Sequence, residues 1–340
     1  MSIPRRHVFT IPPTQVFVDA LAARLLRDHN ADPLELSRVV VLLPTRRACR
    51  SLREAFLRAS GGKAMILPVI QPIGDVDEDE LHLGPQTAAE GPAGLGAQMI
   101  DLPETIPALR RELMLVQLIL KSDAVRAGRD DTPSLDAAQA AHLARDLAAL
   151  IDQVQTERLD FRKLKDIVPE DLASHWQLTL EFLKIITDFW PKILADEGCV
   201  DPAQRRDQIM ALQTAAWKAS PPDVPVYAAG STGSIPATAD LLKVIAELPN
   251  GAVVLPGLDT AMSDEVWDAV ADDPSHPQFG MQHLLNYIAV SRHDVENWTA
   301  ETLDAKSQAR SEMLNAALLP ATTAHRWREA SHISAAALDG

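Results

Sequence analysis

A stretch of basic residues near the N-terminus has the residue types and spacing that could bind a phosphate backbone. In residues 42–57 (LLPTRRACRSLREAFL), Thr45 stands between an apolar run and a helical pattern, where a helix-capping residue belongs. The free N–H groups of a helix start attract anions. Arg46, Arg50 and Arg53 follow at i, i+4 and i+7 on one helix face, with Arg47 beside them. Guanidinium groups in a row at a capped helix start predict contact with a nucleic-acid backbone.

The alternative for this arginine row is a solvated basic face that pairs with nearby acids such as Glu54. The opposite face of the same helix is apolar and is expected to be buried, which fits either interpretation. That apolar face consists of Ala48, Leu52, Ala55 and Phe56. The pattern of residues alone leaves both interpretations open.

A nucleotide-binding loop is missing from the place where it would be expected. Such a loop follows the first strand as a Gly-rich segment that ends in Lys-Ser or Lys-Thr. Here the corresponding residues 10–17 read TIPPTQVF, with Pro12, Pro13 and Thr14 at the turn. Because prolines carry no N–H donor and no lysine is present, a phosphate cradle of the usual kind cannot form there.

A second candidate phosphate loop lies at residues 230–234 (GSTGS), within the longer segment 226–242 (VYAAGSTGSIPATADLL). The loop lacks the lysine and the full glycine spacing of the known motif. A plain turn between a strand and a helix is therefore the favoured interpretation of Gly230 and its neighbours.

Metal and catalytic motifs are weak throughout the sequence. The acidic run of Asp75, Asp77, Glu78, Asp79 and Glu80 lacks the glycine and the alternating ligands of a calcium loop, so a solvated loop is favoured. His276, His283 and His293 do not have metal-ligand spacing and are expected to be structural or exposed. No local arrangement of nucleophile and base argues for catalysis, so we expect no catalytic residue, no metal and no cofactor in this segment.

The elements that would position these residues alternate between strands and helices. Residues 7–11 (HVFTI) predict a strand, and Thr14 could cap a helix that runs to about Asp28. Residues 38–43 (RVVVLL) form a β-branched run, typical of a parallel strand covered on both faces. A second helix follows from Arg46 to about residue 60. This pattern predicts an α/β fold, and it returns later with strands at 224–229 and 252–255 around a helix at 236–248.

The middle of the chain predicts helices only, from about residue 104 to 219. The expected inner faces are Leu109, Leu113, Val116 and Leu120 in the first helix, Leu143, Leu147, Leu150, Ile151 and Val154 in the second, and Leu178, Phe182, Ile185, Ile186 and Phe189 in the third, which Pro191 should kink or end. We therefore expect residues 1–102 to start the α/β domain with an exposed loop at 74–102, residues 103–220 to form an inserted helical domain, and residues 221–340 to return to α/β.

Composition sets limits on this interpretation. The net charge of −15 opposes general nucleic-acid binding, so any DNA contact must be local. No run of about 18 apolar residues suggests a membrane span, and the N-terminus lacks the apolar core of a secretory signal. The two cysteines, Cys49 and Cys199, have no partner ligands nearby. They are expected to be reduced thiols in the cytoplasm.

Several segments together resemble the alphaproteobacterial AddB family, a subunit of the AddAB helicase-nuclease that repairs double-strand breaks. These are residues 8–13 (VFTIPP), 43–57 (LPTRRACRSLREAFL), 67–81 (LPVIQPIGDVDEDEL), 228–242 (AAGSTGSIPATADLL) and 276–285 (HPQFGMQHLL). The family is much longer, and its later nuclease domain has no counterpart in these 340 residues. The resemblance therefore implies an N-terminal segment or a truncated product.

The resemblance implies a degenerate superfamily 1 helicase plan of the P-loop NTPase type. Pro12, Pro13 and Thr14 lie where such helicases keep their ATP-binding loop, and Ala229-Gly230 lies where they keep an Asp-Glu pair. Both parts of the ATPase chemistry would then be absent. The segment of Thr45, Arg46, Arg47 and Arg50, with Arg53 next, lies where a motif contacts single-stranded DNA. The implied partners are the AddA subunit and single- or double-stranded DNA ends, and the implied work is end processing for recombination.

Two rival functions remain open. A pure protein-docking scaffold without DNA contact is favoured by the net charge of −15. A nucleotide-dependent enzyme would use residues 230–234 as its phosphate loop, and the absence of a suitable lysine counts against it.

Overall fold

The computed structural model describes residues 6–29, 34–73, 102–122, 136–161, 163, 182–300 and 305–332. The chain divides into two compact units. The α/β unit comprises Met1–Gly96, Gln213–Ser234 and Thr238–Gly340, and the helical unit comprises Ala97–Leu212 and Ile235–Ala237. The predicted loop at 74–102, including its acidic run, lies outside the described residues except for Leu102.

The α/β unit is built on a six-stranded sheet in the order β3-β2-β6-β7-β1-β8, and each neighbouring pair of strands is parallel. The prediction of an α/β fold with a parallel sheet is confirmed. The strands are β1 (Val8–Ile11), β2 (Val40–Leu43), β3 (Val69–Pro72), β6 (Val226–Ala229), β7 (Gly251–Pro256) and β8 (Glu296–Asn297).

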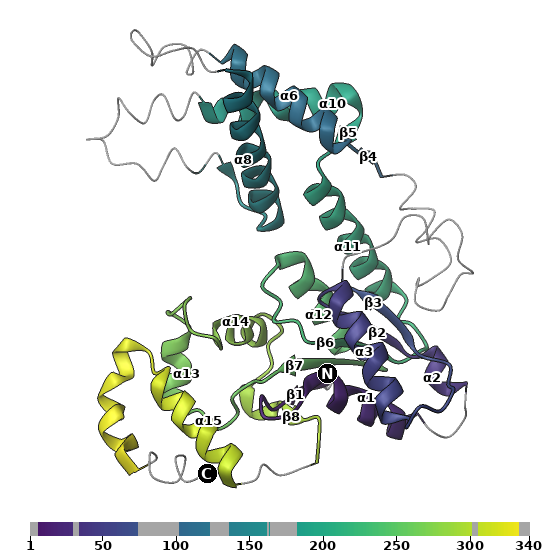
Figure 1. Ribbon diagram of the computed structural model, residues 1–340, viewed down its shortest axis with the longest axis vertical. Coiled ribbons are helices and arrows are strands. Elements are labelled where there is room, and N and C mark those ends of the chain that lie inside the picture. Colours follow the sequence, from purple (N-terminus) through teal and green to yellow (C-terminus); the bar gives the residue numbers. More distant parts are fainter. Residues whose placement is uncertain are drawn as a thin grey trace. The chain divides into compact units, whose positions relative to one another are not determined.

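Strand β2 shows why the sheet forms where the sequence predicts it. All four of its residues are buried, as expected for a strand covered on both faces. Val41 and Leu43 face a core that also takes in Leu21 and Leu25 from α1 and Leu52 and Phe56 from α3. Helices α1 and α3 pack against each other over this core, as Figure 1 shows. The helices of this unit are α1 (Phe17–Asp28), α2 (Glu35–Arg38), α3 (Arg46–Ala59), α12 (Pro236–Glu247), α13 (Asp264–Val270), α14 (Phe279–Tyr287), η5 (Arg292–Asp294), α15 (Ala305–Ala317) and η6 (Ala321–His332).

The start of α1 differs from the prediction. The helix begins at Phe17, its N-cap residue is Val16, and no side chain caps it. Thr14 instead belongs to a turn that Gln15 N closes on the carbonyl of Pro12. The predicted cap at Thr14 is wrong because the chain must first complete this turn after the two prolines.

The helical unit has a separate core between α6 and the helices that follow it. Its elements are β4 (Glu104–Thr105), α6 (Ala108–Lys121), α8 (Ala137–Thr156), η4 (Ile185–Phe189), α10 (Trp190–Glu197) and β5 (Cys199–Val200), and α11 (Pro202–Ala219) is divided between the two units. The short strands β4 and β5 pair in parallel.

The inner face predicted for α6 is wrong. Leu109 is 69% exposed and Leu113 is 54% exposed, whereas Leu115, Ile119 and Arg111 are buried. The helix is rotated because Arg111 faces inward, where Asp152 and Asp201 pair with it. Leucine periodicity cannot reveal an arginine whose burial depends on carboxylates far along the chain.

The other two predicted helix faces agree in part with the structure. In α8, Leu147 and Ile151 are buried, but Leu150 is 38% exposed. In the third helix, Ile185 and Ile186 are buried and Phe189 is exposed, while Leu178 lies outside the described residues.

Pro191 does not end the third helix. It stands in the first turn of α10, and the residues before it form the π-helical segment η4. A proline in the first turn of a helix is tolerated because its missing N–H donor is not needed there.

Candidate nucleic-acid interface

The carboxyl ends of the parallel strands bring the candidate residues to one edge of the sheet. Thr45 follows β2, and Gly230 follows β6, the neighbouring strand. From β2 the chain continues through α3 to β3 on one side, and from β6 it continues through α12 to β7 on the other. Ligands of open α/β sheets bind at such a point of divergence, outside the carboxyl ends of the strands.

Thr45 caps α3 as predicted. Its backbone is extended, with φ −145° and ψ 154°, and its Oγ1 accepts a hydrogen bond of 3.1 Å from the N–H of Ala48. The first turn of α3 contains no acidic residue, so the partial positive charge of the helix start is not offset there.

The arginines of α3 divide into two groups. Arg46, Arg47 and Arg50 are exposed, and no ion pair within the described residues joins Arg47 or Arg50 to a carboxylate, Glu54 included. Arg53 is engaged differently, because its Nη2 donates a hydrogen bond of 3.1 Å to the carbonyl of Ile70 in β3. The structure therefore gives Arg53 a role in holding α3 against the sheet edge, and it leaves the first two turns to present the basic surface.

The opposite face of α3 is buried, with a shift from the prediction. Leu52, Ala55 and Phe56 are buried as expected, together with Cys49. Ala48 is half-buried. Burial of this face fixes the direction of the exposed arginines.

The turn at Pro12, Pro13 and Thr14 lies at the same sheet edge as Thr45, with β7 and β6 between the two strands concerned. A Cβ atom on Gly257 would come within 3.4 Å of Pro13 Cβ, so the turn packs against the segment after β7. The N–H of Gly257 is bonded to the carbonyl of Ile11 and is not available to a ligand.

The loop after β6 is tightly packed around its glycines. Gly230 has φ +78°, and a Cβ atom there would lie 3.3 Å from Phe17 Cε1 and 3.6 Å from Pro44 Cδ. Gly233 has φ +63°, and a Cβ atom there would lie 2.7 Å from Leu284 Cδ1. These glycines are thus required by backbone conformation and close packing, which favours the plain-turn interpretation over a phosphate loop.

The remaining polar groups of this loop are engaged within the loop or lie beneath it. Gly233 N donates to the Ser231 hydroxyl at 3.2 Å, and Ala229 at the end of β6 is fully buried. The segment has no carboxylate between Ala229 and Ser234 that could hold a magnesium ion.

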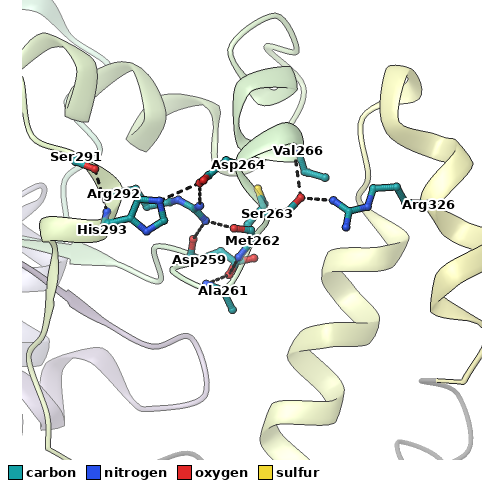
Figure 2. A network of polar contacts seen from close by, with 10 residues as sticks. All are labelled: Asp259, Ala261, Met262, Ser263, Asp264, Val266, Ser291, Arg292, His293 and Arg326. Carbon is teal, nitrogen blue, oxygen red and sulfur yellow. Dashed lines mark hydrogen bonds and ion pairs between the residues drawn. The ribbon is translucent and has the colours of Figure 1, made fainter.

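A buried arginine organises the segment after β7, and the sequence gave no indication of it. Figure 2 shows Arg292 reaching from η5 to the loop before α13. Its guanidinium donates to the carbonyls of Asp259 and Met262 and to Asp264 Oδ1, the last at 2.6 Å. Hydrogen bonds from Arg292 and then from His293 hold the pKa of Asp264 below its ordinary value. A single arginine in a mixed sequence cannot be identified as buried when its acceptors are backbone carbonyls.

The three histidines considered from the sequence have structural surroundings. His276 is buried, and its Nδ1 accepts a hydrogen bond of 3.1 Å from Gln278 N. Gln278 in turn holds the segment after β7, because its side chain bonds Gly257 O and Asp259 N. Burial lowers the pKa of His276.

His283 packs on Phe279, and His293 lies 2.9 Å from Asp264 Oδ1. Across the described ranges, no three His, Cys, Asp or Glu side chains gather as a metal site. Both cysteines are free thiols, Cys49 buried and Cys199 half-buried.

The sequence matches no protein-family model, and no curated protein matches it. No helix in the described part of the chain is long and apolar enough to cross a membrane.

Proposed function

We propose that this chain is the DNA-holding, non-hydrolysing part of a helicase-like subunit of the AddB type. In this proposal it acts with AddA, in the cytoplasm, on the ends of double-strand breaks before recombination. The AddA subunit would supply the motor. The helical unit would correspond to the helical domain that the sequence predicts as an insertion at residues 103–220.

The observation that carries the proposal is the basic start of α3. Three exposed arginines, Arg46, Arg47 and Arg50, occupy the first two turns of a helix capped by Thr45. This helix start lies at the carboxyl edge of a parallel sheet, where such folds bind ligands. Guanidinium groups bind phosphate oxygens through paired, charge-assisted hydrogen bonds, so this surface suits a DNA backbone.

The lack of ATPase chemistry is supported by two places at the same edge. The turn of Pro12, Pro13 and Thr14 has neither a glycine-rich cradle nor a lysine. The end of β6 at Ala229-Gly230 has no carboxylate, and its glycine is packed against Phe17 and Pro44. DNA holding without hydrolysis is consistent with both.

A docking scaffold without DNA contact is the second candidate, and the net charge of −15 favours it. An acidic protein repels nucleic acid except where a local basic surface overcomes that repulsion. The two candidates differ in one measurable property, the dependence of DNA affinity on salt.

The test is fluorescence anisotropy of the full chain with a labelled single-stranded oligonucleotide over a series of salt concentrations. We expect affinity that weakens with salt and falls at least tenfold in Arg46→Glu/Arg47→Glu. Loss of two phosphate contacts should also reduce the slope of log affinity against log salt by about 1.4.

The matched control is Lys306→Glu/Arg310→Glu, two exposed basic residues of α15. Each double variant makes the same change of four charge units, so a loss caused by net charge alone would appear in both. Equal affinity of the α3 variant and the wild type, with both folded, would refute the assignment of the site. Absence of any salt-dependent binding by the wild-type chain would favour the docking scaffold.

A further inference from the structure

The helical unit contains a cavity of about 630 Å³ that the proposed DNA surface does not involve. Its wall comes from the second half of α8, the segment after it, the π-helical turn η4, α10 and β5. Pro191, Ala195 and Gly198 in this wall are exposed, so the cavity can be reached from solvent. Its volume falls in the range of pockets that hold small organic molecules.

At the cavity lies a fully buried carboxylate, Asp201. Its Oδ2 accepts hydrogen bonds from Gln155 Nε2 at 2.8 Å and from Trp190 Nε1 at 3.0 Å. Arg111 Nε lies 2.8 Å from its Oδ1 in an ion pair that lacks hydrogen-bond geometry. These contacts join three helices and explain why the charge tolerates burial.

One acceptor in this arrangement is unused. Gln155 must turn its amide nitrogen toward Asp201, so its Oε1 faces away from the carboxylate. That oxygen is buried and has no hydrogen-bond partner among the residues that the structure describes. Buried acceptors are rarely left without a donor, so this one points to a donor that the chain does not provide.

The charge of the cavity wall indicates the sign of the missing donor. Among its described lining residues are two carboxylates, Asp160 and Asp201, and no lysine, arginine or histidine. Arg111 contributes one formal positive charge against the two carboxylates that it pairs with, Asp152 and Asp201, so one negative charge remains. The other lining residues are mainly apolar, including Ile151, Ile186 and Leu194.

A π-helical turn forms part of the same wall. Ile186 and Thr187 of η4 line the cavity. Such turns are rare, and they are found frequently at functional sites. This observation is independent of the unpaired acceptor and points to the same place.

We propose that this cavity binds a small organic cation, an apolar body that carries an ammonium group. The ammonium group donates to Gln155 Oε1 and complements the negative charge near Asp201, while the apolar body packs against Ile151, Ile186 and Leu194. The site is separate from the basic surface of α3, and it does not rest on the proposed function.

The test uses 2-phenylethylamine as a probe of the full chain with labelled isoleucine methyl groups, followed by NMR. We expect saturable shifts at Ile151 and Ile186, and at least tenfold weaker binding of 3-phenylpropionate, which has the same ring but opposite charge. Gln155→Leu should weaken the amine at least tenfold, since it removes the acceptor of a charge-assisted hydrogen bond. Ala195→Trp, a change at an exposed position of the wall, should block binding without disturbing the core.

Several outcomes would overturn the proposal. These are the absence of shifts at the two isoleucines, equal binding of the amine and the carboxylate, unchanged binding in folded Gln155→Leu, and binding that persists in Ala195→Trp. If Gln155→Leu does not fold, the charge comparison and the Ala195→Trp variant still decide the question.

Discussion

Replacing Asp201 with asparagine should destabilise the helical unit more than any other single charge removal at this cluster. The carboxylate is fully buried and has contacts at 2.8, 2.8 and 3.0 Å. Asparagine keeps the shape and one carbonyl acceptor but removes the charge. Each of the two hydrogen bonds then loses about 1 kcal/mol, the difference between a charged and a neutral acceptor.

The ion pair with Arg111 is also lost in this variant, and Arg111 stays buried with only Asp152 as its partner. Breaking a buried pair costs about 3–5 kcal/mol when one charge is left alone. Because Asp152 still accepts two hydrogen bonds from Arg111, we expect the low end of this range, about 3 kcal/mol.

Hydrogen exchange of peptides from α6 and α8 measures this loss locally, because the two units need not unfold together. About 3 kcal/mol corresponds to roughly a hundredfold faster exchange of the protected amides. The control is Asp152→Asn, whose carboxylate is 39% exposed and whose loss should cost about 1 kcal/mol. An Asp201→Asn effect equal to or smaller than that of Asp152→Asn would refute the reasoning.

Two further predictions concern the α/β unit. Thr45→Ala removes the side-chain cap of α3 and should lower the free energy of unfolding by about 1 kcal/mol in urea titration, whereas Thr45→Ser should restore most of it; equal stability of all three would contradict the cap. Burial lowers the pKa of His276 from 6.5, so the unfolded chain takes up this proton first as the pH falls below about 6.5, and stability should fall with it. Thermal unfolding between pH 7.5 and pH 5 should show this loss in the wild type and a smaller loss in His276→Asn; identical pH profiles would exclude His276 as its source.

The parts of the fold that could be predicted are those in which one segment carries its own pattern. Strand β2 is a run of apolar residues, mostly β-branched, and α3 has both a capping residue and an apolar stripe. Local preference and burial agree there, so the sequence alone indicates both the element and its buried face.

The parts that could not be predicted depend on distant partners. Strand β8 has only two residues, Glu296 and Asn297, both exposed, and it forms because it pairs with β1. The neighbouring Trp298 is buried between the rings of Phe9 and Tyr227, at centroid distances of 5.3 and 5.8 Å. None of these contacts leaves a periodic pattern in residues 296–298.

The candidate interface shows the same division. Thr45 as a cap followed from its position between a strand and a helix, and the structure confirms it. The bond from Arg53 to Ile70 could not be foreseen, since it requires knowing that β3 lies beside β2. DNA binding by Arg46, Arg47 and Arg50 stays a prediction.

The position of β1 has a consequence for how the protein is made. Val8 pairs with Val253, and the other edge of β1 pairs with Glu296 and Asn297. During translation the first strand therefore leaves the ribosome with neither of its neighbours available. At ordinary elongation rates, the wait for β7 is on the order of 10 to 50 s. Over that interval an apolar strand with two open edges must be kept from pairing with other nascent chains, so we expect this chain to need a chaperone during synthesis.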